Sequence, residues 1–179
     1  MNKTPYSNLG FSMIEVLITL LLVCIGVLGM VAMQGRTQQY TQDSVQRNNA
    51  AMLANDLIEL IRANPLGPSE FYKAKGTAFA DTPGTGCSST TQVPTEQLAC
   101  WAQKATNILP GVTTTLLTSD FYICRSLTPG DGDATACPAT GSAVEIKLVW
   151  TVKAGECMDS TDANNAASTL CSYRLRTQI

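Results

Sequence analysis

Six of the seven cysteines of this 179-residue chain fall after residue 86, where their spacing could indicate a metal site, a redox pair or structural disulfides. None belongs to a CxxC pair, so the spacing indicates neither a zinc knuckle nor a thioredoxin-like redox pair. An even number of widely spaced cysteines is typical of structural disulfides formed in an oxidising compartment. Fifteen connectivities are open to six cysteines. We favour the pairs that close short loops of similar size: Cys87–Cys100, Cys124–Cys137 and Cys157–Cys171.

The chain contains no histidine, which excludes Ser-His-Asp and Cys-His catalysis and the usual histidine-bearing zinc sites. Its net charge of −2 offers no basic surface for nucleic acid, so we expect no direct nucleic-acid binding. Two oxygen-rich loops, 131–133 and 159–164, lack the twelve-residue pattern of a calcium-binding EF-hand, and we interpret them as solvated turns. We therefore expect no enzyme, and no catalytic, metal-binding or cofactor-binding residues.

Glu15 stands at the start of an apolar segment, because Val16 to Met33 is a run of eighteen residues without a charge. The run approaches the roughly 20 residues that cross a bilayer and exceeds the apolar core of a cleaved signal peptide. We therefore expect a retained membrane helix. An ionised carboxylate near the bilayer centre costs roughly 3 kcal/mol or more. Glu15 reaches water at the interface, is protonated, or awaits a positive partner from another chain.

Cleavage between Gly10 and Phe11 would create such a partner. The new α-amine would lie four residues before Glu15 and would be largely charged at neutral pH, since its pKa is near 7.7–8.0. In a helical stack, the amine of one subunit would neutralise Glu15 of the next. Relief of the buried charge would then favour assembly and set its register.

The segment Gly10-Phe11-Ser12-Met13-Ile14-Glu15-Val16-Leu17-Ile18 resembles the leader junction of type IV pilins and pseudopilins. That motif joins a glycine before the cut, an aromatic new N-terminus, a glutamate at the fifth mature position and a long apolar helix. The resemblance implies that a prepilin peptidase cleaves after Gly10 and methylates the amine of Phe11. Residues 1–10 would then be the leader peptide. Many major pilins carry a proline midway in this helix, whereas this chain has Gly26, Gly29 and Gly35.

Three later segments resemble the type IV pilus modification protein PilV family: 54–65, Trp101 with 108–111, and 144–150. This resemblance implies a minor pilin, a structural subunit that primes pilus assembly and so supports twitching motility, adhesion and DNA uptake. The implied partners are other minor and major pilins, the inner-membrane assembly machinery, the prepilin peptidase and methyltransferase, a tip adhesin, and membrane lipid before assembly.

The charges that flank the apolar segment, Lys3 and Arg36, give no clear orientation in the membrane. The cysteines favour a periplasmic C-terminal domain, because disulfides form in an oxidising compartment. We expect a single-pass protein of the bacterial inner membrane that enters a pilus at the cell surface. Two alternatives stay open. One is a minor pseudopilin of a type II secretion system, and the other is a membrane-anchored periplasmic binding domain or enzyme.

The periodicity predicts one helix from Ile14 to Ala63, ended by Asn64-Pro65. Residues 11–34 would lie in the membrane or filament core, and residues 35–64 would be amphipathic. The expected apolar stripe of the second half consists of Val45, Met52, Leu57, Leu60 and Ile61.

Residues 65–179 are expected to form a globular α+β domain. A loop over 66–94 precedes a short helix over 95–107. In this loop, Phe71-Tyr72 either contacts a partner or anchors the loop. The expected strands are 112–117, 121–125, 144–152 and 173–179, the third half-buried with alternating faces. Trp101 and Trp150 are assigned to the core. The predicted fold is thus type IV pilin-like: a long N-terminal helix on an antiparallel sheet, with a disulfide-bonded C-terminal domain.

Overall fold

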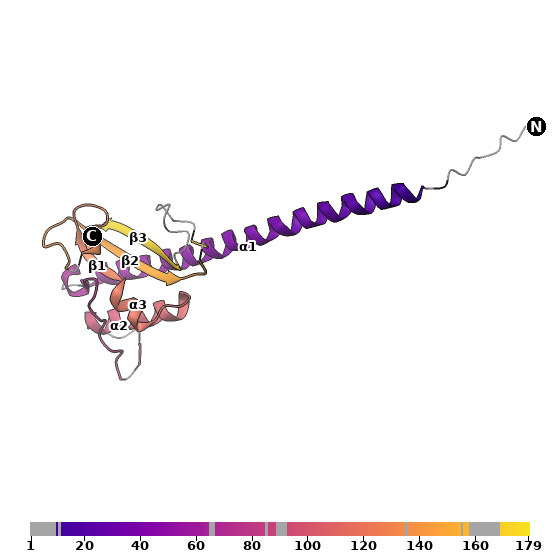
Figure 1. The fold of residues 1–179 in the computed structure, drawn as a ribbon. Coiled ribbons are helices and arrows are strands. Elements are labelled where there is room, and N and C mark those ends of the chain that lie inside the picture. The colour runs from indigo at the N-terminus through magenta and orange to yellow at the C-terminus, as the bar shows by residue number, and fades with distance from the viewer. Residues whose placement is uncertain are drawn as a thin grey trace, which may run out of the picture. The chain divides into compact units, whose positions relative to one another are not determined.

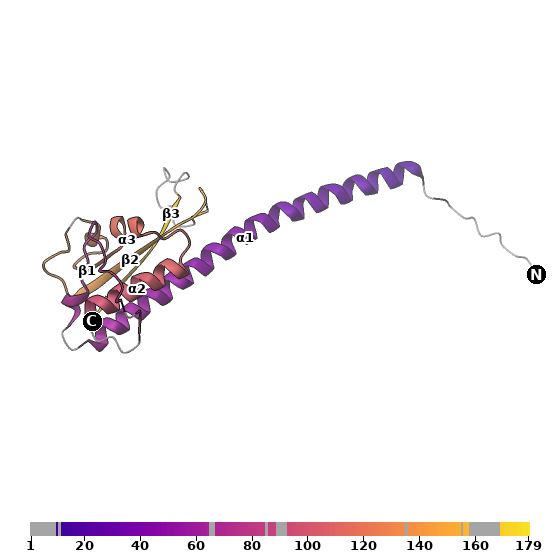
Figure 2. The same ribbon diagram turned by 90° about the horizontal axis from the view of Figure 1, so that it is seen from below.

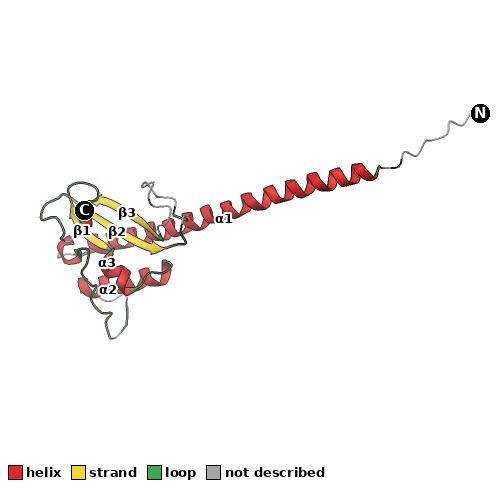
Figure 3. Cartoon of the chain, in the orientation of Figure 1, coloured by secondary structure: helices red, strands yellow, loops and turns green. Residues whose placement is uncertain are grey.

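The computed structural model describes residues 10, 12–64, 67–84, 86–88, 93–134, 136–154, 156–157 and 169–179. Its helices and strands are shown in Figure 1 and coloured by type in Figure 3. In chain order they are α1 (Met13–Ala63), η1 (Pro68–Phe71), α2 (Pro94–Ile108), α3 (Thr114–Ser119), β1 (Tyr122–Ser126), η2 (Asp131–Asp133), β2 (Ala143–Thr151) and β3 (Leu170–Gln178). The chain divides into two compact units, Met1–Thr41 and Gln42–Ile179. A long apolar helix, an antiparallel sheet and three disulfides confirm the predicted pilin-like α+β class.

The first unit contains the beginning of α1. Ser12 caps the helix, since its carbonyl oxygen accepts from the backbone N–H of Glu15 at 3.0 Å and of Val16 at 3.3 Å. The helix runs on to Ala63 without a break, through Gly26, Gly29 and Gly35. It is long and apolar enough to cross a membrane, and none of its most apolar window is buried within the chain.

In the second unit, one face of α1 forms part of the core. The buried side chains of this face are Ala50, Leu53, Ala54, Leu57, Ile58 and Ile61. The predicted stripe was partly wrong, because Val45 is 52% exposed and Met52 65% exposed. Two alanines take their place in the core. Small side chains let the helix approach the sheet closely, and an apolar pattern built on large residues alone overlooks them.

The two tryptophans join α1 to its neighbours and lie in the core, as predicted. The indole nitrogen of Trp101 on α2 donates to the backbone oxygen of Leu53 at 2.8 Å, and Figure 2 shows α2 beside the end of α1. The indole nitrogen of Trp150 on β2 donates to Gln46 Oε1 at 2.7 Å. Each large ring is therefore buried with its single polar atom satisfied.

The sheet has the order β1-β2-β3, and both pairs are antiparallel. Its core face carries Ile123, Ile146 and Leu175 at neighbouring positions of the three strands. The opposite face, called the outer face below, carries Tyr122, Glu145, Lys147 and Arg174. The prediction of a half-buried central strand was wrong, because β2 is buried on both faces and Glu145 is 0% exposed.

The predicted strand over 112–117 is instead helical, as α3. The side-chain oxygen of Thr113 accepts from the backbone N–H of Leu116 at 3.2 Å, which caps the helix. Threonine favours strands only weakly and serves equally well at a helix N-terminus, so a run of three threonines misled the prediction.

The connection expected over 66–94 is more ordered than predicted. It contains η1, and Lys73 forms an antiparallel bridge with Ile123. Phe71 is 0% exposed, so it anchors this connection in the core and the partner-contact interpretation of Phe71 was wrong. Tyr72 packs against the same core while partly exposed. Burial of the Phe71 ring depends on aliphatic side chains from other elements, which come together only in the folded domain. The sequence around Phe71 therefore does not predict this burial.

Replacing Leu57 by alanine should destabilise the second unit, because Leu57 is fully buried. Such truncations cost about 2–5 kcal/mol, which lowers the Tm of a domain this size by roughly 5–15 °C. Thermal melts of the full chain in detergent, followed by near-UV circular dichroism, measure the change. Met52→Ala is the matched control on the same helix and should leave the Tm within about 2 °C. Equal losses in both variants would contradict the assigned helix face.

Candidate functional site

The first candidate site is the exposed apolar surface of α1 in the first unit. Its large aliphatic side chains from Val16 to Met33 are between 48% and 75% exposed. Contiguous apolar surface of this extent indicates contact with lipid or with other proteins. Ideal Cβ atoms at Gly26, Gly29 and Gly35 would meet nothing within 4 Å, so these positions are open to close approach by a neighbour.

Glu15 lies in the first turn of this helix and is exposed, as is Gly10. A carboxylate near a helix N-terminus is favoured by the unpaired backbone N–H groups there. Phe11 lies outside the described residues, so the distance from its amine to Glu15 is not defined. The side chain of Glu15 is thus presented at the end of the apolar surface, available to a cationic group from another chain.

The six C-terminal cysteines form the three nearest-neighbour disulfides expected, with Cα–Cα distances of 5.0–5.5 Å. Cys87–Cys100 ties residues 86–88 to α2, and Cys124–Cys137 ties the connection after β1 to that strand. Cys157–Cys171 ties residues 156–157 to the start of β3. Each contributes about 2–4 kcal/mol by restricting the unfolded chain. The remaining thiol, Cys24, is free and exposed on α1.

A group of charged side chains covers the outer face of the sheet. Asp133 accepts from Lys147 Nζ at 2.6 Å and from the Arg174 guanidinium at 2.5 Å, and Lys75 Nζ lies 3.8 Å away. Burial alone would raise the pKa of Asp133, but the hydrogen bond from Lys147 and the three positive charges hold it below its usual value. We call Asp131, Asp133, Glu145, Lys147 and Arg174 the outer-face network.

Glu145 is the buried centre of this network. Its carboxylate accepts from the Tyr122 hydroxyl and from the backbone N–H of Gly130 at 3.0 and 3.1 Å, and Arg174 Nε lies 3.4 Å away. Burial and the hydrogen bond to Glu145 raise the pKa of Tyr122, so its proton stays in place. A Cβ at Gly132 would collide with the Tyr122 ring, which explains the glycine there. No spacing pattern in the sequence indicates this group, whose only local signal is a glutamate among apolar residues of β2.

Three of the four carboxylate oxygens of loop 131–133 are already engaged, and Asp131 Oδ1 is buried without a hydrogen-bond partner. Asp131 Oδ2 accepts from the backbone N–H of Leu127 at 2.7 Å and of Thr128 at 3.0 Å. The hydrogen bond from Thr128 is the largest cause of a lowered pKa at Asp131, and that from Leu127 acts in the same direction. The loop is a 3-10 turn held to the sheet, where we expected a solvated turn. The second oxygen-rich loop, 159–164, lies outside the described residues.

Among the described residues, Asp43, Cys157 and Cys171 have ligand atoms within 4.8 Å of one another, the spacing that a metal site needs. Both sulfur atoms are joined in a disulfide, and Asp43 pairs with Arg47 Nε at 2.7 Å. A disulfide sulfur is a poor metal ligand because it carries no thiolate charge. This cluster therefore serves as a structural junction between α1 and β3.

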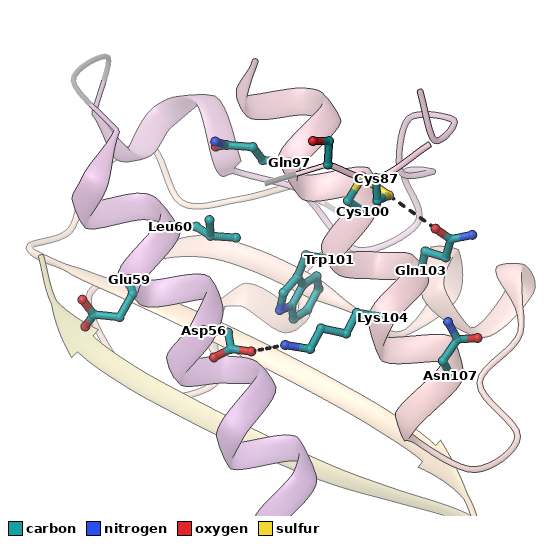
Figure 4. Close-up of a pocket in the computed structure, with 11 residues that line it drawn as sticks. Asp56, Glu59, Leu60, Cys87, Gln97, Cys100, Trp101, Gln103, Lys104 and Asn107 are labelled. Carbon is teal, nitrogen blue, oxygen red and sulfur yellow. Dashed lines mark hydrogen bonds and ion pairs between the residues drawn. A yellow bond between two sulfur atoms is a disulfide. The ribbon is translucent and has the colours of Figure 1, made fainter. Parts of the chain in front are cut away.

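An open pocket of about 840 Å³ lies between α1 and α2 in the second unit. Figure 4 shows Asp56 on α1 and Lys104 on α2 pointing toward one another across it, with Nζ–Oδ2 at 2.5 Å. Its lining consists of Asp56, Glu59, Leu60, Cys87, Ser88, Gln97, Cys100, Trp101, Gln103, Lys104 and Asn107. Asp56 is paired with Lys104 and Glu59 with Arg62, and both cysteines are oxidised. Such a lining can hold a polar molecule but arranges no nucleophile beside a base.

The outer-face network predicts acid-sensitive stability. A carboxyl whose pKa is lowered on folding stabilises the fold above its ordinary value, here 3.8, and this stabilisation is lost as the pH falls through the folded-state value. Asp133→Asn should lower the Tm by a few degrees at pH 7 and flatten the decline of Tm below pH 4. Thermal melts between pH 2 and pH 7 measure both effects, with the exposed Asp81→Asn as control. A decline as steep in Asp133→Asn as in wild type would contradict the role of Asp133.

The sequence of residues 32–105 matches a family model described as Tt1218-like, type IV pilin Tt1218. This stretch covers less than half of the chain. No curated protein and no solved structure matches the chain. The match begins at the last two residues of the apolar segment and shares no residue with the Gly10–Ile18 motif, so the two observations are independent. Together with the fold, the match indicates similarity to a type IV pilin family.

Proposed function

We propose that this chain is a minor pilin of the PilV type, a subunit inserted into a type IV pilus or placed at its tip. The observation that carries the proposal is the Gly10–Glu15 junction directly followed by an exposed apolar helix of membrane-spanning length. The pilin match over residues 32–105 supports it from a separate part of the chain. The expected roles are priming of pilus assembly and hence twitching motility, adhesion and DNA uptake.

Assembly would begin with processing of the N-terminus. A prepilin peptidase cleaves after Gly10, removes residues 1–10 and methylates the amine of Phe11. The mature helix then presents a positive amine four residues before Glu15. Because an ionised carboxylate in lipid is costly, pairing with the amine of a neighbouring subunit relieves that cost. The gain favours insertion of the subunit at one register of the filament.

The second unit would remain outside the cytoplasm. Its three disulfides need an oxidising compartment, which in a bacterium is the periplasm and then the cell surface. Before assembly the apolar half of α1 would cross the inner membrane, where lipid covers its exposed side chains. In the filament the same surface would be covered by other minor and major pilins, with the prepilin peptidase, the assembly machinery and a tip adhesin as further partners.

Intact mass spectrometry of the membrane-extracted protein tests the processing step. We expect loss of residues 1–10 and a gain of about 14 Da for one methyl group. Reduction and denaturation should then add about 6 Da for three disulfides. A mass that retains residues 1–10 would overturn the pilin proposal and favour an anchored periplasmic domain, for which the pocket between α1 and α2 is the first place to seek a ligand.

Substitution of Glu15 by glutamine tests the charge pairing. Glutamine keeps the size of the side chain and removes its charge, so folding and membrane insertion should be unchanged. Incorporation into sheared filaments should fall by about tenfold, the factor that corresponds to about 1.4 kcal/mol. Quantitative immunoblotting of filament and membrane fractions measures the ratio.

The control for this experiment is Glu59→Gln, which removes an exposed carboxylate from the same helix within the second unit. This variant should assemble as the wild type does. Full incorporation of the Glu15→Gln protein would contradict the charge-pairing mechanism but not the proposal that the chain is a pilin. Deletion of the gene separates the two machines: lost twitching supports a pilus, and lost release of exoproteins supports a type II secretion pseudopilus.

A further inference from the structure

β3 forms one edge of the sheet. The backbone N–H and C=O groups of its successive residues point alternately toward β2 and away from the sheet. The backbone N–H of Val152 donates to the Thr169 oxygen at 2.7 Å, in the register that continues through all nine pairs of β2 and β3. In an antiparallel ladder every second residue bonds to the partner strand. The backbone groups of Cys171, Tyr173 and Leu175 therefore point to β2. Those of Ser172, Arg174 and Arg176 point away from the sheet.

The opposite edge of the sheet is covered by the chain itself at one residue pair. The same alternation directs the backbone of Ile123 on β1 outward, where Lys73 meets it. The two residues exchange both backbone hydrogen bonds, Lys73 N–H to Ile123 oxygen at 2.8 Å and Ile123 N–H to Lys73 oxygen at 2.9 Å. Within the part of the chain that the structure describes, no such cover reaches the outward groups of Ser172, Arg174 and Arg176.

β3 is also a regular edge. Its nine residues pair one to one with β2, so it contains no bulge, and it contains no proline. Proteins commonly protect such edges with bulges, prolines or covering segments, because an open edge is a template for pairing with another chain. Here the only device of that kind on β3 is the charge of its two arginines.

From this arrangement we infer that the β3 edge binds an extended segment of a partner protein, which adds a fourth strand to the sheet. Main-chain hydrogen bonds to Ser172, Arg174 and Arg176 would supply affinity, and alternate side chains of the added strand would supply specificity. The inference does not depend on the pilus assignment, because it rests on the globular unit alone.

The charges beside the edge select an acidic partner. Arg174 shares Asp133 with Lys147 and Lys75 and also lies 3.4 Å from Glu145, so three cations meet two carboxylates at this point and one positive charge is left over. The side chain of Arg174 is 37% exposed, so its guanidinium can donate to a further carboxylate on the outer face of the sheet. Residues directly opposite in a strand pair lie about 5 Å apart, where opposite charges attract and like charges repel. The added strand should therefore carry glutamate or aspartate on its outer face.

The same charges disfavour three of the registers in which a second copy of this chain could occupy the edge. Antiparallel pairing of two β3 strands about Arg174, Leu175 or Arg176 sets arginines across from arginines. On the core face, Tyr173 and Leu175 are only partly buried at the edge. An added strand with apolar side chains on that face would cover them. The fitting partner is thus an extended segment of another protein in which acidic and apolar residues alternate.

The test uses the full chain in detergent micelles and two synthetic peptides as long as β3. One alternates glutamate with valine, and its matched control alternates lysine with valine. Amide exchange measured by NMR in the free protein should be fast at Ser172, Arg174 and Arg176 and slow at Tyr173 and Leu175. The glutamate peptide should slow exchange at the three outward amides by about tenfold or more, and the lysine peptide should not.

Ser172→Pro gives a second, independent arm. Proline removes an outward donor and spares the hydrogen bonds to β2, since Ser172 does not point to that strand. It should weaken binding of the glutamate peptide by about tenfold, whereas Ser172→Ala, which keeps the N–H, should bind as wild type does. Circular dichroism confirms that each variant is folded. If the proline variant does not fold, the comparison of the two peptides on the wild-type chain still tests whether the β3 edge binds an acidic strand.

Three outcomes would overturn the inference. The glutamate peptide would give no protection at millimolar concentration, or both peptides would protect equally, which indicates contact without charge selection. Alternatively, the outward amides would become protected with rising protein concentration in the absence of peptide. That last result would assign the edge to a second copy of this chain.

Discussion

The fit of a single helix to two environments is the constraint on which the rest of this molecule depends. α1 continues from Met13 to Ala63, yet its residues up to Thr41 and those from Gln42 onward belong to different compact units. The first part exposes aliphatic side chains all round, which suits lipid or a filament core. The second part buries only one face, built of two alanines and four larger aliphatic residues. The sheet can assemble only where that face is present.

Two covers protect the sheet once α1 lies on its core face. The core face is closed by α1 and by the tryptophans, whose indole nitrogens are each satisfied by an acceptor on α1. The outer face is closed by polar groups, with Glu145 at the centre and the Cys124–Cys137 disulfide holding the covering loop. A buried carboxylate is tolerable here because a hydroxyl, a backbone N–H and a guanidinium surround it. Among the described residues, the regular strand edge of β3 has no covering strand.

These features assign different tasks to the two units. An apolar helix with a glutamate in its first turn suits insertion into an assembly whose neighbours provide positive charge. A small domain held by three disulfides suits exposure outside the cell, where its modest core alone would leave little stability. A pilin needs both properties in one chain. The pilin match over residues 32–105 bridges the two units, since it begins in the first and ends in the second.

Periodicity alone predicted the long helix, its end near Ala63 and the α+β class, because these follow from local patterns. Loop length only favoured the disulfide pairs among the fifteen connectivities, and the structure contains those pairs. The short helix over 95–107 and three of four strands were likewise predictable to within a few residues. Tertiary structure decided the rest. It chose alanines over Val45 and Met52 for the buried face, made 114–119 helical, and buried Glu145 beneath a loop. Each of these depends on which distant groups come into contact, and no local pattern specifies those contacts.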